Sequence, residues 1–353
     1  MTGTDARRYS RQITLAEVGE SGQRALADAS VLVVGAGGLG SPVLHHLSAS
    51  GVGHIGLVEF DQVDVSNLHR QTLYATTDIG RDKAEAARER LRAINPNVRV
   101  DAFAERLDAR NAPHLLSGFD VVVDGSDSFS TRYIVNDAAV ALGIPNVYAS
   151  VSQLSGQASV LGAAGGPCYR CLFPSPPPAG LIPSCAEGGV LGVVPALLGT
   201  IQATEALKLI LGIGTPLVGR LLMVDALTME VREVRFERDP DCPACGDDRR
   251  TMPVDDARDI SVRALADRLA EGEDVALLDV REAAEHVAFD IGGRLIPLGM
   301  LDARAFELDD LRDREIVVYC ATGGRSGQAA RLLTQRGFRA VSLRGGLEAW
   351  REA

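Results

Sequence analysis

The stretch Ser30-Val-Leu-Val-Val-Gly-Ala-Gly-Gly-Leu-Gly40 decides the fold of the first part of the chain. Its apolar run, residues 30–34, is typical of a buried parallel strand, and the glycines open a helical pattern that reaches about Ser50. Glycines between a strand and a helix let backbone amides approach a phosphate, although plain tight turns use them too. The stretch predicts a nucleotide-binding α/β unit, and taken alone it is most typical of a dehydrogenase that binds a dinucleotide.

The alternation of strand and helix patterns continues beyond this stretch. We expect strands at 54–60, 98–103, 121–123, 221–224 and 230–236, and helices at 82–94 and 130–142. Together they indicate a doubly wound α/β sheet. The longest apolar stretch, 188–201, contains Pro195 and is followed by polar residues at helical spacing, so it predicts a largely buried helix rather than a membrane span.

A polar stretch without periodicity, residues 239–256, precedes a second α/β pattern. We therefore expect a domain at 1–246, a linker at 247–258 and a smaller α/β domain at 259–353. The length of 353 residues also points to about two domains.

Composition limits the classes of function that the chain can have. The net charge of −11 disfavours non-specific binding of nucleic acid. The first residues have no apolar run that could form a signal peptide, and the chain lacks the uninterrupted apolar segment that a membrane span needs. We expect a cytoplasmic protein that binds neither membranes nor nucleic acid.

Polar residues gather directly after the second expected strand. Asp61 could hold a ribose, and Asn67 with Arg70 could hold a triphosphate, a cluster that a hydride-transfer enzyme does not need. Lysine is rare, because Lys83 and Lys208 are the only two in the chain. In a chain that otherwise uses arginine, each lysine is a candidate for a position that needs a compact ammonium group, which arginine cannot mimic.

Four further motifs accompany the glycine loop in a fixed order: Tyr9-Ser-Arg-Gln12, the run 61–71, Ile79-Gly-Arg-Asp-Lys-Ala84 and Asp124-Gly-Ser-Asp127. With that loop they resemble the MoeB and ThiF adenylyltransferases of the ubiquitin-activating superfamily, over about residues 5–245. The resemblance implies that ATP is bound by Gly38, Gly40 and Asp61 and that Asn67, Arg70, Gln71 and Lys83 surround its phosphates. It also implies that Asp127 organises Mg²⁺ and that Arg11 reaches the ATP site of a partner subunit in a homodimer.

The implied roles fit the chemistry. Attack of a carboxylate on the α-phosphorus of ATP brings two anions together, so the site must supply cations and a metal ion. Arg11, Arg70, Lys83 and Asp127 are accordingly our candidate catalytic residues in the first domain.

Two C-x-x-C pairs supply four of the six cysteines. They are Cys168-Tyr-Arg-Cys171 and Cys242-Pro-Ala-Cys245. Four thiolates in this arrangement are typical of a tetrahedral structural zinc site, and a reducing cytosol argues against the alternative of two disulfides. We expect Zn²⁺ to hold the fold together rather than to catalyse.

The fifth cysteine, Cys185, follows the proline-rich run 174–178. A free cysteine is most often a small buried apolar residue. The family resemblance implies another role, because a cysteine in this loop can link covalently to an activated carrier protein. Both interpretations stay open.

The sixth cysteine, Cys320, ends an expected strand and begins the loop Cys320-Ala-Thr-Gly-Gly-Arg325. Residues 259–353 resemble a rhodanese domain through this loop, through Leu277–Glu282 and through Gly345–Trp350. Four residues lie between Cys320 and Arg325, as in sulfurtransferases, whereas the related phosphatases have five. The resemblance implies a persulfide on Cys320. Ala321 stands where members that use thiosulfate often have a cation, so another donor is expected.

Three further residues of this domain carry groups that could belong to a site. Asp279 and Arg281 are expected to support the loop, and His286 to be a packed or surface residue.

The two resemblances together predict one reaction sequence. The first domain would adenylate the C-terminal glycine of a ubiquitin-like sulfur-carrier protein ending in Gly-Gly, and Cys320 would deliver sulfur, directly or through Cys185, to give a thiocarboxylate. A desulfurase-type or small-molecule donor would supply that sulfur. Three alternatives remain: an activating enzyme for protein conjugation through a Cys185 thioester, a non-enzymatic scaffold, and a dehydrogenase.

Overall fold

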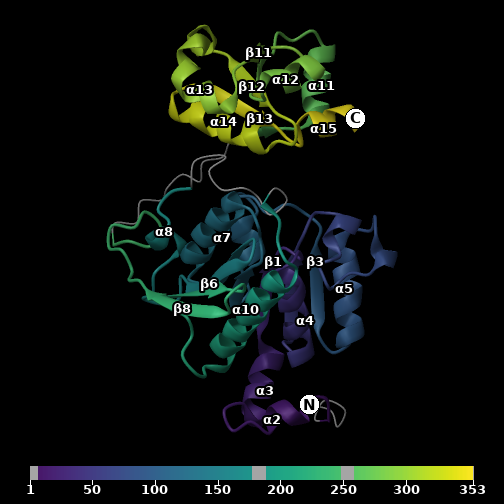
Figure 1. The fold of residues 1–353 in the computed structure, drawn as a ribbon, viewed down its shortest axis with the longest axis vertical. Coiled ribbons are helices and arrows are strands. Elements are labelled where there is room, and N and C mark those ends of the chain that lie inside the picture. The colour runs from purple at the N-terminus through teal and green to yellow at the C-terminus, as the bar shows by residue number, and fades with distance from the viewer. Residues whose placement is uncertain (1–6, 177–187, 248–257, 353) are drawn as a thin grey trace. The chain divides into compact units, whose positions relative to one another are not determined.

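The computed structural model describes residues 7–176, 188–247 and 258–352, which form two compact units (Figure 1). Within the described residues the first unit runs to residue 247 and the second begins at residue 258. The second unit includes Arg258, the last residue of the expected linker, because Arg258 pairs with Val341 in its sheet.

The first unit is built on an eight-stranded sheet with the order β3-β2-β1-β4-β5-β6-β7-β8. The strands are β1 Ser30–Val34, β2 His54–Val58, β3 Arg99–Phe103, β4 Val121–Asp124, β5 Asn146–Ser152, β6 Ser155–Leu161, β7 Arg220–Asp225 and β8 Glu230–Arg235. The first five pair in parallel, as the doubly wound pattern predicts. Strands β6 to β8 extend the sheet in antiparallel fashion, and β5 and β6 were not expected from the sequence.

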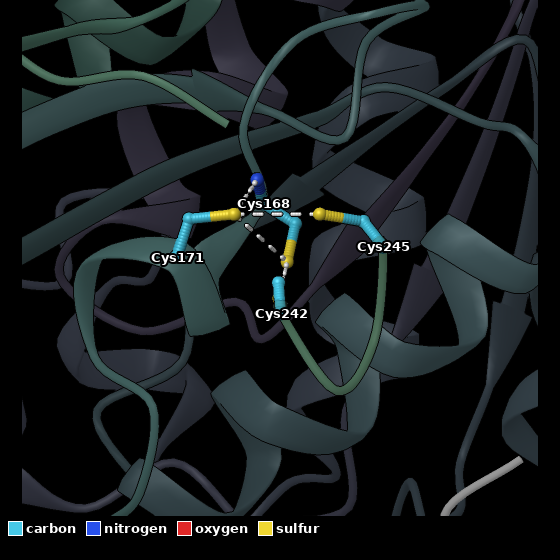
Figure 2. Close-up of side chains that lie close together, drawn as sticks. All are labelled: Cys168, Cys171, Cys242 and Cys245. Carbon is cyan, nitrogen blue, oxygen red and sulfur yellow. Dashed lines mark hydrogen bonds between the residues drawn. The ribbon is translucent and has the colours of Figure 1, made fainter. Parts of the chain in front are cut away.

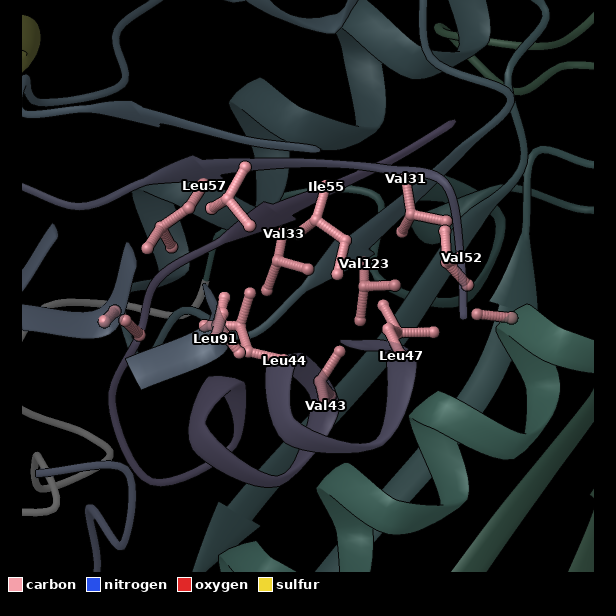
Figure 3. Close-up of a cluster of buried hydrophobic side chains, with 14 of the residues drawn as sticks. Val31, Val33, Val43, Leu44, Leu47, Val52, Ile55, Leu57, Leu91 and Val123 are labelled. Carbon is pink, nitrogen blue, oxygen red and sulfur yellow. The ribbon is translucent and has the colours of Figure 1, made fainter. Parts of the chain in front are cut away.

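Helices pack on this sheet. They are α2 Ser10–Ile13, α3 Gly19–Asp28, α4 Gly40–Ser50, α5 Lys83–Ile94, α6 Ala112–Leu116, α7 Phe129–Leu142, α8 Tyr169–Leu172 and α10 Val193–Leu211, with short 3₁₀ turns at Val65–Asn67 (η1) and Thr76–Asp78 (η2). Alternate residues of β1 face opposite sides: Val31 and Val33 join the cluster with α4 and α5, and Leu32 and Val34 join the cluster with α6 and α7. Figure 3 shows the first of these clusters. A strand buried on both faces explains the continuous apolar run 31–34.

Helix α10 is the apolar helix predicted near Pro195. Within the described residues it is the one helix long and apolar enough to cross a membrane, yet it contacts α4, β5 and β6 as a core helix does. Val193 and Leu197 are exposed, so the helix is less completely buried than expected. The fully buried Gln202 ties it to the sheet, because its amide nitrogen donates to the carbonyls of Asp124 (2.7 Å) and Val147 (2.9 Å).

The second unit has a five-stranded parallel sheet with the order β11-β10-β12-β13-β9. Its elements are β9 Arg258–Ile260, α11 Val262–Ala270, β10 Ala276–Asp279, α12 Ala283–Ala288, β11 Arg294–Leu295, α13 Leu298–Arg304, η3 Ala305–Leu311, β12 Glu315–Tyr319, α14 Gly324–Gln335, β13 Arg339–Leu343 and α15 Gly346–Glu352. Side chains of β10 and β12 alternate between two apolar clusters, one on each face. The smaller α/β domain expected from the sequence is confirmed.

The Gln202 contacts lead to a stability prediction. Replacing Gln202 with Met keeps the volume but removes both hydrogen bonds to β4 and β5, which should lower the free energy of unfolding by about 2 kcal/mol. Urea unfolding followed by circular dichroism measures this loss. Thr204→Met, on the exposed face of the same helix, should leave the midpoint unchanged, and equal midpoints for both variants would contradict the prediction.

Candidate functional site

The glycine loop lies at the carboxyl end of β1, between β2 and β4, where the strand order reverses. Ligands of doubly wound sheets bind at this point. Gly35 has φ +89°, and a Cβ on Gly40 would lie 1.9 Å from the carbonyl oxygen of Gly35. Side chains are therefore excluded at both positions. The loop brings the chain back on itself and presents the amino end of α4 to a ligand.

Glu59 makes contacts with the glycine loop that the sequence analysis missed. It directly follows β2, is 7% exposed, and accepts a hydrogen bond from the amide of Ala36 at 2.9 Å. Its other oxygen accepts hydrogen bonds from the backbone amides of Phe60 and Asp61. An acidic residue about 20 positions beyond the glycines, at the end of the second strand, is where such folds hold a ribose. That spacing could have identified Glu59.

Asp61 lies beside Lys83 instead. Its carboxylate is half exposed and receives the Lys83 ammonium at 3.2 Å, while the Lys83 side chain is 4% exposed. Tyr74 joins this pair to the glycine loop, because its hydroxyl donates to the carbonyls of Ala36 (3.1 Å) and Lys83 (3.4 Å). A buried cation is thus fixed next to the loop, with the exposed carboxylate of Asp61 as its ion-pair partner.

Asn67, the last residue of η1, forms one hydrogen-bonded group with Arg70 and Gln71, which follow it. The Asn67 side-chain oxygen accepts from the guanidinium of Arg70 at 2.8 Å and from the amide of Gln71 at 2.9 Å. A Cβ on Gly37 would lie 3.6 Å from the Gln71 amide nitrogen, and one on Gly38 would lie 3.6 Å from Arg70 Cγ. The structure therefore brings these three side chains to the glycine loop.

Asp127 lies in the loop that joins β4 to α7 and is exposed. The fully buried Asp124 shapes this loop, because its carboxylate accepts hydrogen bonds from the backbone amide (3.0 Å) and the hydroxyl (2.6 Å) of Ser126. Burial raises the pKa of Asp124. A Cβ on Gly35 would meet the carbonyl oxygen of Gly125 at 3.1 Å, so the loop carrying Asp127 adjoins the glycine loop.

Arg11 lies apart from this cluster within its own chain. It is exposed on α2, whose preceding residue Tyr9 packs on Gly51 and accepts a hydrogen bond from Asn95 at 2.7 Å. Gly51 precedes β2, so α2 sits at the amino ends of the strands, opposite the glycine loop. Cys185, the other residue expected to act beyond this cluster, lies outside the described residues.

The two C-x-x-C pairs meet as expected (Figure 2). All four sulfur atoms lie within 4.8 Å of one another, with Cys168–Cys242 at 3.6 Å and Cys171–Cys245 at 3.3 Å. A tetrahedron of thiolates about 2.3 Å from zinc has edges of about 3.8 Å, whereas a disulfide needs about 2 Å. Asn136 lies next to this cluster, with its amide nitrogen 3.8 Å from Cys168 Sγ. The four cysteines fit a zinc ion.

Cys320 lies at the carboxyl end of β12 in the second unit, fully buried. Its sulfur accepts a hydrogen bond from the backbone amide of Gly323 at 3.1 Å and lies 3.5 Å from the hydroxyl of Ser326. Gly323 has φ +94°, and a Cβ there would lie 3.1 Å from the amide nitrogen of Gly345. The loop therefore curls around the sulfur, directly before the amino end of α14.

Asp279 and Arg281 form a buried ion pair behind this loop. Arg281 donates to both oxygens of Asp279 and to the carbonyls of Glu285 and Phe289. His286 Nδ1 lies 2.9 Å from Asp279. Hydrogen bonds from Arg281 and His286 lower the pKa of Asp279 although burial opposes this. These hydrogen bonds join the end of β10 to α12 and to Phe289, and among the described residues none of these three side chains is hydrogen-bonded to Cys320, so they support the fold around the loop.

Known proteins match both units. The family model of the ThiF family matches residues 9–244, and that of the rhodanese-like domain matches residues 261–353. The sulfur carrier protein adenylyltransferase of Thermus thermophilus is 56% identical over 246 residues, which cover 68% of this chain and 91% of that protein. The crystal structure of E. coli MccB with MccA-N7isoASN has a TM-score of 0.61 at 23% identity, over 68% of this chain and 75% of that chain, a likeness of fold.

Two relatives span both units. The probable adenylyltransferase/sulfurtransferase MoeZ of Mycobacterium tuberculosis is 44% identical, over 97% of this chain and 92% of that protein. The adenylyltransferase and sulfurtransferase MOCS3-1 of Zea mays is 38% identical, over 97% of this chain and 81% of that protein. The chain therefore belongs to the ThiF family, with a C-terminal rhodanese-like domain, and is an adenylyltransferase and sulfurtransferase of the MoeZ/MOCS3 type.

Proposed function

We propose that the chain adenylates the C-terminal glycine of a ubiquitin-like sulfur-carrier protein with ATP and then converts it to a thiocarboxylate with sulfur carried on Cys320. The observation that carries this proposal is the gathering of Glu59, Asn67, Arg70 and Lys83 at the glycine loop. The similarity to the sulfur carrier protein adenylyltransferase of Thermus thermophilus supports a carrier protein as the substrate.

Each group at the glycine loop has a task in the adenylation step. The amides of the Gly38–Gly40 turn and the Asn67, Arg70, Gln71 and Lys83 side chains offset the charge of the phosphates as the carboxylate attacks the α-phosphorus. Glu59, with Asp61 beside it, accepts hydrogen bonds from the ribose. Asp127 would hold Mg²⁺, which would neutralise the departing pyrophosphate. Arg11 acts in the site of a second copy, since within its own chain it lies at the other end of the sheet.

The adenylate makes sulfur transfer possible, because AMP is a good leaving group and a free carboxylate is a poor electrophile. The terminal sulfur of a Cys320 persulfide, or of a persulfide passed to Cys185, attacks the acyl carbon and AMP departs. A thiol then attacks the cysteine sulfur of this acyl disulfide and releases the thiocarboxylate, and a second thiol restores the cysteine. A desulfurase-type protein or a small molecule supplies the sulfur.

The alternative of protein conjugation through a Cys185 thioester has support of its own. The SAMP-activating enzyme E1 of Haloferax volcanii is 47% identical over 70% of this chain and 91% of that protein. Conjugation would need Cys185 and leave Cys320 dispensable.

We further propose that the protein works in the cytoplasm, where thiols stay reduced. There the four cysteines Cys168, Cys171, Cys242 and Cys245 would hold one structural Zn²⁺. The ion would tie the segment before α8 to the segment after β8 and leave no open position for chemistry.

Adenylation is tested by ATP–pyrophosphate exchange in the presence of a carrier ending in Gly-Gly. Lys83→Met keeps the buried stem and removes the ammonium, and should lower the exchange rate at least about a hundredfold. Arg92→Met, which removes an exposed cation from the same helix α5, should leave the exchange rate unchanged. Equal rates for the wild type and Lys83→Met would contradict the proposed role.

The zinc assignment predicts one zinc per chain by elemental analysis. Cys242→Ser should lose the metal and lower the melting temperature of the protein, by about 10 °C if the site contributes about 3 kcal/mol. Cys320→Ser, which removes a cysteine from the other unit, should keep both the metal and the melting temperature. A metal-free wild type with an unchanged melting temperature would refute a structural ion.

Sulfur delivery is tested with Cys320→Ser. This variant should retain carrier-dependent pyrophosphate exchange but form no thiocarboxylate, which mass spectrometry detects as a 16 Da increase in the carrier, about the mass by which sulfur exceeds oxygen. The same assay on Cys185→Ser shows the route of the sulfur, because thiocarboxylate forms without Cys185 only if Cys320 delivers the sulfur directly. Attachment of the carrier to protein that is lost in Cys185→Ser and kept in Cys320→Ser would instead support conjugation. Undiminished thiocarboxylate from Cys320→Ser would exclude Cys320 as the sulfur carrier.

A further inference from the structure

The loop around Cys320 contains one charged residue, Arg325, and the structure gives it a partner from another element. Both terminal nitrogens of its guanidinium donate to the carboxylate of Glu285, at 2.7 and 2.6 Å. Glu285 lies on α12, 40 residues earlier in the chain. A bidentate pair of this kind uses the two donors with which an arginine would grip an oxyanion.

The pair is held in place on both sides. Arg325 is in the first turn of α14, and Glu285 also accepts the amide of Glu282 at 3.0 Å, within the first turn of α12. Hydrogen bonding from Arg325 lowers the pKa of Glu285 to about 2, so the carboxylate stays charged in neutral solution. Both side chains are about one-third exposed (35% and 37%), which places the pair at the surface of the loop.

The remaining loop residues, Ala321 to Gly324, carry no charge. Behind the loop, the Asp279 carboxylate and the Arg281 guanidinium compensate each other. Whether Arg325 is free or paired therefore changes the charge that an incoming donor meets at the loop.

We propose that Glu285 is a specificity-determining residue for the sulfur donor: by pairing with Arg325 it disfavours the thiosulfate dianion and favours the persulfide of a thiol. This inference rests on the proposed role of Cys320 as the sulfur carrier.

The two donors differ in the charge that the loop must stabilise. With thiosulfate, the Cys320 thiolate attacks the outer sulfur, the sulfur–sulfur bond breaks, and sulfite leaves with the electron pair as a dianion. With a persulfide, the thiolate attacks the terminal sulfur and one singly charged thiolate leaves. A free guanidinium stabilises the first transfer more than the second, because attraction grows with the charge of the ligand.

The experiment uses the full chain, sodium thiosulfate as donor and cyanide as acceptor, with thiocyanate as the measured product. Glu285→Gln keeps the size of the side chain and frees Arg325, so kcat/KM for thiosulfate should rise about tenfold and fall more steeply with added salt. Glu307→Gln is the matched control, because Glu307 also forms a bidentate pair with an arginine, Arg304, in the same unit. It should leave kcat/KM unchanged.

A double variant distinguishes two causes of a higher thiosulfate activity, the freed charge of Arg325 and a more mobile loop around Cys320. Glu285→Gln with Arg325→Gln has no cation to release, so the gain should disappear. A gain that persists in the double variant, or no gain in Glu285→Gln, would overturn the inference.

Loading of Cys320 by sodium polysulfide, read by mass spectrometry, keeps the two proposals apart. If the wild type acquires sulfur on Cys320 but Glu285→Gln is no better with thiosulfate, the donor preference is refuted and the role of Cys320 as the sulfur carrier stands. A wild type that acquires no sulfur from either donor refutes the role of Cys320, and the donor preference with it.

Discussion

The close approach of Gly40 to the carbonyl oxygen of Gly35 is the constraint on which the first unit depends. Because no side chain fits between them, the chain can leave β1, turn and start α4 within a few residues. The turn lies at the carboxyl ends of β1, β2 and β4, and Glu59, the group Asn67–Arg70–Gln71 and the loop that carries Asp127 all adjoin it. The functional groups come from distant parts of the sequence, but one backbone contact gives them a common centre.

Much of the fold follows from local patterns. The runs at β1, β2, β4 and β12 are apolar because both faces are covered, and such runs are visible without a structure. The β5–β6 hairpin was missed for a physical reason. Its turn places Gln153 at φ +53°, a conformation that turns usually assign to glycine or asparagine, so the sequence contains no turn signal there.

In the candidate sites too, some groupings are visible in the sequence and others depend on the folded structure. Spacing along the chain was enough to group Asn67 with Arg70, and to pair Cys168–Cys171 with Cys242–Cys245, whereas Gln71 was added by the family resemblance. Spacing alone did not distinguish Glu59 from Asp61, because the choice depends on where β2 ends and on which carboxylate turns toward Ala36. The Arg325–Glu285 pair joins two elements whose proximity only the parallel sheet of the second unit creates.

The position of the cysteine cluster has a consequence for how the chain folds as it is made. Cys168 and Cys242 are 74 residues apart, and the segment between them contains α10, β7 and β8. A metal bound by all four thiolates closes this long loop, and removing that freedom from the unfolded chain is worth about 4 kcal/mol if the closure acts like a covalent cross-link. The fourth cysteine, Cys245, is synthesised before the second unit begins. A metal bound by the four thiolates would therefore complete the first unit while the rhodanese-like domain is still being translated.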